Sequence, residues 1–252
     1  MIDYQHHRYL RTAETRDVLP LFGEPPASVL EIGAGAGWQA SILSASGFHV
    51  TAIDVPQPQY QRDKAYPVLP YDGKTLPFPN RSFDIVFSSN VLEHIPHVEE
   101  FQAEIHRVLK PGGRAIHMMP TSAWLISSIA MHYPWVLKEA CRAFFRRSLP
   151  ATDMASNGRH WTFAQLALYA LFPRRHGERG NVVTEIALFQ KKAWIDLFDR
   201  TGWQVVDCRP NQLYYSGHTI LGYSAGIPLR RALSYCLGSG SRTYVLRPRQ
   251  RP

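Results

Sequence analysis

The chain has little cysteine and no long apolar run. Its three cysteines, at positions 141, 208 and 236 of 252 residues, share no motif spacing. An odd, scattered set is not a disulfide framework and indicates a reducing compartment. The first residues lack the apolar core of a secretory signal peptide. Ser127, Ser128 and His132 interrupt the longest candidate for a membrane span. We therefore expect a cytoplasmic protein.

The sequence also lacks the loop that holds a dinucleotide pyrophosphate. That loop runs G-x-G-x-x-G, whereas this chain has G-x-G-x-G at Gly33, Gly35 and Gly37, preceded by an acid at Glu31. A short apolar run comes before the loop, and a helical segment and a second apolar run follow it, ending at Asp54. Asp54 comes 17 to 21 residues after the three glycines, where an acid can accept hydrogen bonds from ribose hydroxyls. The pattern predicts a site for a nucleoside-containing cofactor.

The acid-led glycine loop resembles the first motif of the class I S-adenosylmethionine-dependent methyltransferases, and three further motifs follow in order. They are 72-DGKTLPFP-79 leading into 82-SFDIVF-87, then 90-NVLEHI-95, then 105-IHRVLKPGG-113. The resemblance covers residues 29–119 and favours the small-molecule branch of the family.

The resemblance implies a cofactor, S-adenosylmethionine, and the residues that surround it. The acid and the glycines of the first loop lie around its methionine part, and the first acid of the second motif holds the adenine amino group. The implied cofactor-binding residues are Glu31, Gly33, Gly35, Gly37, Asp54, Asp72, Gly73 and Asn90.

The same resemblance bears on metal and on catalysis. Some relatives bind magnesium through E-x-x-E-H, but here the first acid of that pattern is Asn90, so no metal is expected. A hydroxyl acceptor benefits from a base that removes its proton. His94, just past the fourth predicted strand, is the first choice for that base. His160 and His176 are the alternatives, and a structural role for each histidine remains open.

Two classes of nucleic-acid methylase are disfavoured by what is missing. Amino-directed enzymes carry N/D-P-P-aromatic after the fourth strand, where this chain has Ser88-Ser89-Asn90-Val91. Enzymes with a cysteine nucleophile need Pro-Cys at a strand end, and the chain has no such pair. We therefore expect O-methylation of a small, lipid-linked or glycan acceptor. An RNA methyltransferase and a non-catalytic cofactor-binding or membrane-associated protein remain as alternatives.

Charge is divided unevenly along the chain. Residues 1–120 hold 10 Lys/Arg against 13 Asp/Glu, net −3, and residues 121–252 hold 18 against 7, net +11, in agreement with the total of +8. A basic surface attracts nucleic acid, anionic lipid or a phosphorylated substrate. The basic half also holds two apolar, aromatic segments with arginines, a predicted helix over 134–147 and the segment 213–237. They suit an anionic membrane surface or plain packing on the core.

The order of elements predicts an α/β, Rossmann-like fold. A helix is expected over 3–19, strands over 28–32, 49–53, 66–69, 83–88 and 114–119, a helix over 190–201, and strands over 203–209 and 242–247. The run 182–189 is strand-like. The resemblance implies a doubly wound, mostly parallel seven-stranded sheet whose last strand is antiparallel. We assign residues 1–120 to the cofactor half, 121–189 to a helical acceptor-binding insertion after the fifth strand, and 190–252 to the completion of the sheet.

Overall fold

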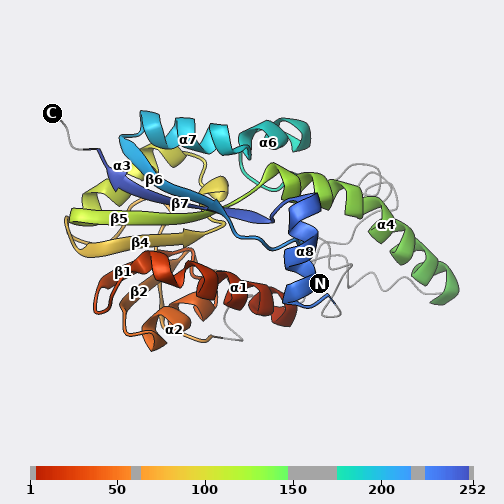
Figure 1. The fold of residues 1–252 in the computed structure, drawn as a ribbon, viewed down its shortest axis with the longest axis horizontal. Helices are drawn as coiled ribbons and strands as arrows, with labels where there is room; N and C mark the ends of the chain where they lie inside the picture. Colours follow the sequence, from red (N-terminus) through yellow and green to blue (C-terminus); the bar gives the residue numbers. More distant parts are fainter. Residues whose placement is uncertain (1–3, 58–63, 147–174, 217–224, 250–252) are drawn as a thin grey trace.

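The computed structural model describes residues 4–57, 64–146, 175–216 and 225–249, with side chains described only up to residue 137 in the second range. One sheet runs through the molecule, with helices on both of its faces (Figure 1). In chain order the elements are α1 (Tyr4–Val18), η1 (Leu19–Phe22), β1 (Ser28–Ile32), α2 (Trp38–Ala45), β2 (His49–Asp54), β3 (Val68–Pro70), β4 (Phe83–Ser89), η3 (Leu92–His94), α3 (Val98–Val108), β5 (Leu109–Pro120), α4 (Ser122–Arg146), α6 (Val182–Leu188), α7 (Lys191–Arg200), β6 (Trp203–Pro210), α8 (Ile227–Leu237) and β7 (Ser241–Pro248).

The sheet has seven strands in the order β3-β2-β1-β4-β5-β7-β6. The first five pair in parallel, and β7 is antiparallel to both of its neighbours. Parallel neighbours need a long crossover, and the order reverses between β1 and β4, so the carboxyl ends of these two strands flank the switch point where doubly wound folds bind ligands. The predicted fold class is confirmed. The assignment of residue ranges to functional halves stays a prediction.

Each face of the sheet has its own core. Val18, Phe22 and Leu43, from α1, η1 and α2, are buried with Phe87 and Ile116 on one face. The other face buries a larger set from α3, α7 and the strands, which includes Phe101, Ile105, Trp194, Phe198 and Trp203. Two filled faces hold the central strands rigidly, and their carboxyl ends provide a stable support for a site.

Residues 182–188 form helix α6, so the strand-like interpretation of the run 182–189 was wrong. Asn181 caps α6: its side-chain oxygen accepts from the backbone N–H groups of Val183 and Thr184, both at 3.0 Å. The hydroxyl of Thr184 in turn accepts from the backbone N–H of Asn181 at 2.8 Å. This reciprocal cap satisfies donors that a helix start leaves free, and it outweighs the β-branched residues that follow.

The helix predicted over 134–147 begins much earlier. α4 starts at Ser122, directly after β5, and Pro134 lies inside it. Proline inside a helix removes one backbone hydrogen bond, so Pro134 was a plausible start from the sequence alone. The strand expected over 114–119 also begins earlier, because α3 ends at Val108 and β5 already runs through the 111-PGG-113 segment.

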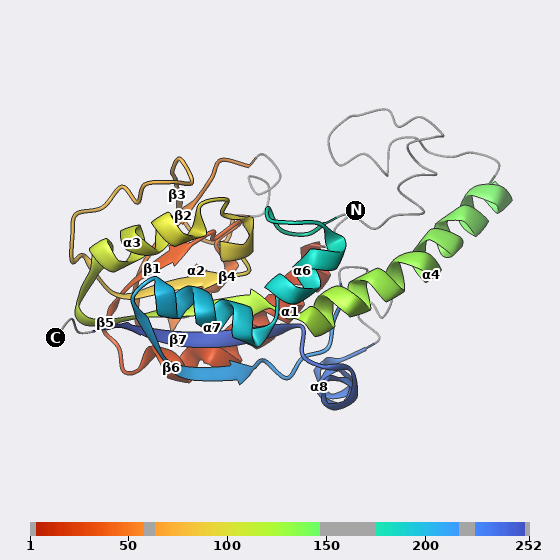
Figure 2. The same cartoon turned by 90° about the horizontal axis from the view of Figure 1, so that it is seen from above.

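α4 reaches away from the sheet beyond the carboxyl ends of the parallel strands (Figure 2). The residue before it contacts the segment after α8, since Thr121 donates its hydroxyl hydrogen to the backbone oxygen of Ser239. Within the described residues, no helix combines the length and the apolar character needed to cross a bilayer.

Candidate active site

The loop after β1 has a backbone that requires glycine. Gly33, Gly35 and Gly37 have φ of 73°, 57° and 77°, in the left-handed region. A Cβ on Gly33 would lie 2.3 Å from a methyl carbon of Val91, closer than carbon atoms can approach. Side chains here would therefore strain the turn and fill the space between β1 and the segment after β4.

Asp54, at the end of β2, is tied to this loop. Its Oδ2 accepts a hydrogen bond of 2.6 Å from the backbone N–H of Gly35. Burial raises the pKa of the Asp54 carboxyl, and the bonds from backbone N–H groups oppose that rise. The structure thus brings the predicted ribose acid and the glycine loop together, as parallel pairing of β1 with β2 requires.

Glu31 is buried beneath the loop, with 1% of its surface exposed. Burial, and then repulsion from Asp54, raises the pKa of Glu31 to about 8. Within the described residues its Oε2 has no hydrogen-bond partner. A buried acceptor without a donor costs free energy, which a cationic group bound at this point would recover.

Asp72 and Gly73 lie in the loop after β3, at the same end of the sheet. Oδ1 of Asp72 accepts from the backbone N–H groups of Lys74 and Thr75, both at 2.8 Å, and these bonds lower the pKa of Asp72. Gly73 has φ of 78° and allows this turn. The carboxylate is fixed by its own loop and stays charged.

Asn90 follows β4 with φ of 52°, a left-handed conformation that asparagine tolerates. Its backbone N–H donates to the carbonyl of Met118 at 2.8 Å, which joins the ends of β4 and β5. With its amide oxygen turned toward α1, Asn90 accepts from the guanidinium of Arg11. The Arg11 guanidinium also donates to Oε2 of Glu14 at 2.7 Å.

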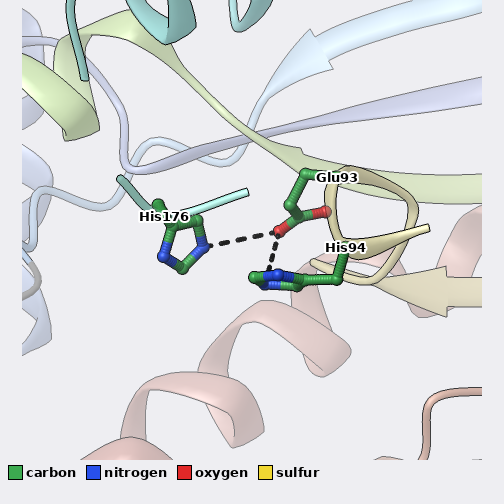
Figure 3. A group of neighbouring side chains, drawn as sticks. All are labelled: Glu93, His94 and His176. Carbon is green, nitrogen blue, oxygen red and sulfur yellow. Dashed lines mark ion pairs between the residues drawn. The ribbon is translucent and has the colours of Figure 1, made fainter. Parts of the chain in front are cut away.

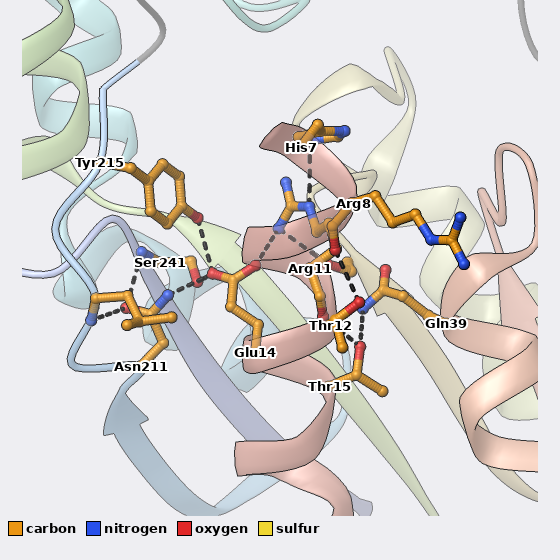
Figure 4. A network of polar contacts seen from close by, with 12 residues as sticks. His7, Arg8, Arg11, Thr12, Glu14, Thr15, Gln39, Asn211, Tyr215 and Ser241 are labelled. Atoms are coloured by element: carbon orange, nitrogen blue, oxygen red, sulfur yellow. Dashed lines mark hydrogen bonds and ion pairs between the residues drawn. The ribbon is translucent and has the colours of Figure 1, made fainter. Parts of the chain in front are cut away.

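A network around Glu14 was not predicted from the sequence (Figure 4). Oε1 of the fully buried Glu14 accepts from the hydroxyls of Tyr215 and Ser241, both at 2.9 Å, and from the amide of Asn211. This network ties α1 to the chain segments that follow β6 and begin β7, and so holds Arg11 beside Asn90. The Arg11 and Glu14 spacing of three residues on one helix is a weak signal, because such pairs are common on exposed helices.

His94 ends η3, and its ring centroid lies 4.8 Å from that of His176. Burial lowers the pKa of His94. Both rings lie beside the carboxylate of the buried Glu93 (Figure 3). The structure thus unites two of the three histidines considered as bases, and the third, His160, lies outside the described residues.

Known proteins with similar sequences and folds are methyltransferases. Residues 4–207 match the family described as a methyltransferase domain. An uncharacterized methyltransferase of Mycobacterium marinum is 31% identical over 184 residues, which cover 65% of this chain and 71% of that protein. A sterol 24-C-methyltransferase of Gibberella zeae is 32% identical over 117 residues, 42% of this chain and 30% of that protein. An S-adenosylmethionine-dependent methyltransferase structure from Mesorhizobium loti superposes with a TM-score of 0.55, at 16% identity, over 93% of this chain and 97% of that one.

Together, the fold, the glycine loop and the family match define the protein as a class I methyltransferase. The chain belongs to this methyltransferase family and is an S-adenosylmethionine-dependent enzyme. The residues fit the cofactor: Glu31 offers a buried acceptor to its cationic methionine part, and Asp54 offers a carboxylate at the position expected for the ribose. The roles of the individual residues remain predictions.

Glu31 provides a pH-dependent test of this fit. With a pKa of about 8, roughly nine in ten Glu31 side chains are protonated at pH 7. A bound ammonium nearby would lower that pKa, so cofactor binding should release close to one proton. Calorimetry in two buffers of different ionisation enthalpy measures this release, and Glu31→Gln should abolish it. An equal release from the variant would contradict this role for Glu31.

The same carboxyl should affect stability. Its pKa in the folded chain lies above the ordinary value of 4.5, so the folded state keeps the proton to higher pH than the unfolded state. Stability should therefore fall as pH rises from about 4.5 to about 8 through this group. Glu31→Gln should remove that part of the fall in thermal denaturation scans of the cofactor-free chain.

Proposed function

We propose that the enzyme O-methylates a small, lipid-linked or glycan acceptor that enters at the carboxyl ends of β4 and β5. The observation that carries this proposal is the placement of His94 and His176 beside the buried carboxylate of Glu93, in the segment that follows β4. A polar cluster of this kind suits removal of a hydroxyl proton.

The cofactor supplies an electrophilic methyl group on a sulfonium. The chain positions the acceptor and holds the proton that leaves it. Burial lowers the pKa of His94, so its imidazole is neutral and able to accept a proton at pH 7. Glu93 lies 3.8 Å from Nε2 of His94 and stabilises the imidazolium that results.

Exposed apolar side chains on α4 and α8 support an apolar acceptor. α4 exposes Ile126, Tyr133 and Leu137, the last with 66% of its surface accessible, and α8 exposes Tyr235 and Leu237. The relative from Gibberella zeae acts on a sterol, which is consistent with an apolar acceptor here. The basic second half of the chain adds attraction to an anionic headgroup or membrane surface.

Two measurements test the proposal. Metabolite profiling of a strain that lacks this gene should reveal a compound one methylene lighter than its wild-type counterpart. With that compound as acceptor, His94→Gln should lower kcat by roughly 100- to 10,000-fold, the usual contribution of a general base, while cofactor affinity is unchanged. Because the pKa of His94 is lowered, wild-type kcat should decline only below about pH 6.5.

An acceptor methylated on carbon or nitrogen would contradict O-methylation. Retained nucleic acid with a steep salt dependence of binding would instead support the RNA alternative. A chain that binds cofactor and turns over no cellular acceptor would support the non-catalytic alternative.

A further inference from the structure

The carboxylate of Glu93 has no evident reason to be buried. Its side chain is fully shielded from solvent, and within the described residues neither oxygen has a hydrogen-bond partner. Two histidine nitrogens lie beside it at long distances, Nε2 of His94 at 3.8 Å and Nε2 of His176 at 3.7 Å from Oε1. A buried carboxylate without donors costs several kcal/mol unless a cation compensates it.

His176 is held against Glu93 by a docked loop. Glu185, buried in α6, accepts from the backbone N–H groups of His176 at 2.9 Å and Gly177 at 2.7 Å. The N–H of Glu178 donates to the backbone oxygen of Glu93 at 3.0 Å. A Cβ on Gly177 would lie 2.8 Å from that same oxygen, so this close approach requires glycine. Two elements far apart in the sequence thus form one preorganised site.

The side chains of Glu93 and His94, from η3, and of His176, from the loop before α6, point toward one another (Figure 3). One ligand atom from each of Glu93, His94 and His176 lies within 4.8 Å of the other two. Around tetrahedral Zn²⁺, with ligands at about 2.0–2.1 Å, neighbouring ligand atoms are about 3.4 Å apart. Small side-chain rotations would therefore bring this set into coordination distance.

We propose that Glu93, His94 and His176 bind a divalent transition-metal cation of the Zn²⁺ type. Two imidazoles and one carboxylate favour such a cation over Mg²⁺ or Ca²⁺, which prefer oxygen ligands. Three protein ligands leave a coordination position for the acceptor hydroxyl, which the metal would make more acidic. This step rests on the proposed function, whereas metal binding itself does not.

The proposal replaces the expectation of a metal-free site. That expectation followed from the E-x-x-E-H pattern, in which Asn90 replaces the first acid. The pattern is local in sequence, so it did not consider His176 as a ligand. A lone pair of His94 that binds metal does not accept a proton, so the metal would take over the activation assigned to His94 in the metal-free enzyme. Aromatic contacts of His176 with Trp124, at 4.5 Å between ring centroids, are the competing reason for its position.

Titration of the metal-stripped full chain with Zn²⁺, without acceptor, tests the site. We expect one high-affinity equivalent in the wild type. Glu93→Gln and His176→Gln should each weaken Zn²⁺ affinity by more than about 100-fold. A factor of that size exceeds the usual loss when only a hydrogen-bond partner of a metal ligand is removed.

His97→Gln is the matched control, because this exposed histidine lies three residues from His94 and outside the cluster. It should change affinity by less than about threefold, within ordinary surface effects. Co²⁺ should give visible absorption bands that both ligand variants lack.

Cofactor affinity and thermal stability are measured on the same samples. Retained cofactor binding shows that the ligand variants are folded, and metal-free Glu93→Gln should be no less stable than the wild type, since it removes an uncompensated buried charge. Absence of tight Zn²⁺ binding by the wild type, or equal binding by both ligand variants, would overturn the metal site. Neither result bears on the methyltransferase function. That function would be contradicted only if the chain did not bind the cofactor or did not transfer its methyl group to an acceptor.

Discussion

A Gly35→Val variant is expected to lose S-adenosylmethionine binding. Gly35 has φ of 57°, which a β-branched residue does not adopt without strain, and its N–H donates to Asp54. A valine would displace the loop and break the contact between it and the ribose acid. We expect affinity to fall by more than about 100-fold, or about 2.7 kcal/mol. Isothermal calorimetry on the purified variant measures the loss.

Two comparisons make this result specific. Asp54→Ala also removes the contact with Gly35. It keeps the glycine backbone of the loop, however, so it should weaken binding less, by about 1–3 kcal/mol for the lost hydrogen bonds of the carboxylate. Gly112→Val is the control, because Gly112 also has a left-handed φ, of 79°, but its missing Cβ faces open space in β5. It should lower stability and leave cofactor affinity unchanged. Normal cofactor binding by Gly35→Val would contradict the assignment of the loop.

Reversal of three charges should abolish binding to anionic vesicles. Arg142 and Arg146 belong to α4, and Arg147 follows it outside the described residues. Each basic residue near an anionic surface contributes about 1 kcal/mol, so Arg142→Glu, Arg146→Glu and Arg147→Glu together should weaken binding by at least about 3 kcal/mol. Vesicle flotation at low salt measures it, and wild-type binding should also weaken as salt is added.

Lys191, Lys192 and Arg247 provide a matched control for net charge. Changing all three to glutamate alters the total charge equally, on α7 and β7 instead of α4. This control should keep vesicle binding, and both variants should keep cofactor affinity. Absence of binding by the wild type, or equal binding by the α4 variant, would assign the apolar residues of the segment 134–147 to packing on the core.

The sheet could be predicted from the sequence because its signals are local. Apolar runs such as 28–32 and 83–89 form strands, and helix-linked strands must pair in parallel. The glycine loop and Asp54 met as expected, since β1 and β2 are neighbours in the sheet. The run 182–188 became a helix because of its Asn181 cap, a signal that its apolar, β-branched composition obscured.

Contacts between distant segments could not be predicted. His176 reaches Glu93 only because Glu185 and Gly177 shape the loop between them, and no local pattern encodes that meeting. The buried Glu14 likewise has hydrogen-bond partners 197, 201 and 227 positions later in the chain. Such contacts depend on the tertiary structure, so the sequence can indicate the residues but not which residues they contact.

The hydrogen bonds of Glu14 have a consequence for the folding pathway. Its partners Asn211, Tyr215 and Ser241 come late in the chain, so during synthesis α1 leaves the ribosome long before they exist. Contacts of such high sequence separation form late, because the closure entropy of a long loop must be overcome first. The central parallel strands can therefore pair while α1 is still undocked. Since α1 carries Arg11 to Asn90, the active-site end of the sheet is completed only when the last strand, β7, joins.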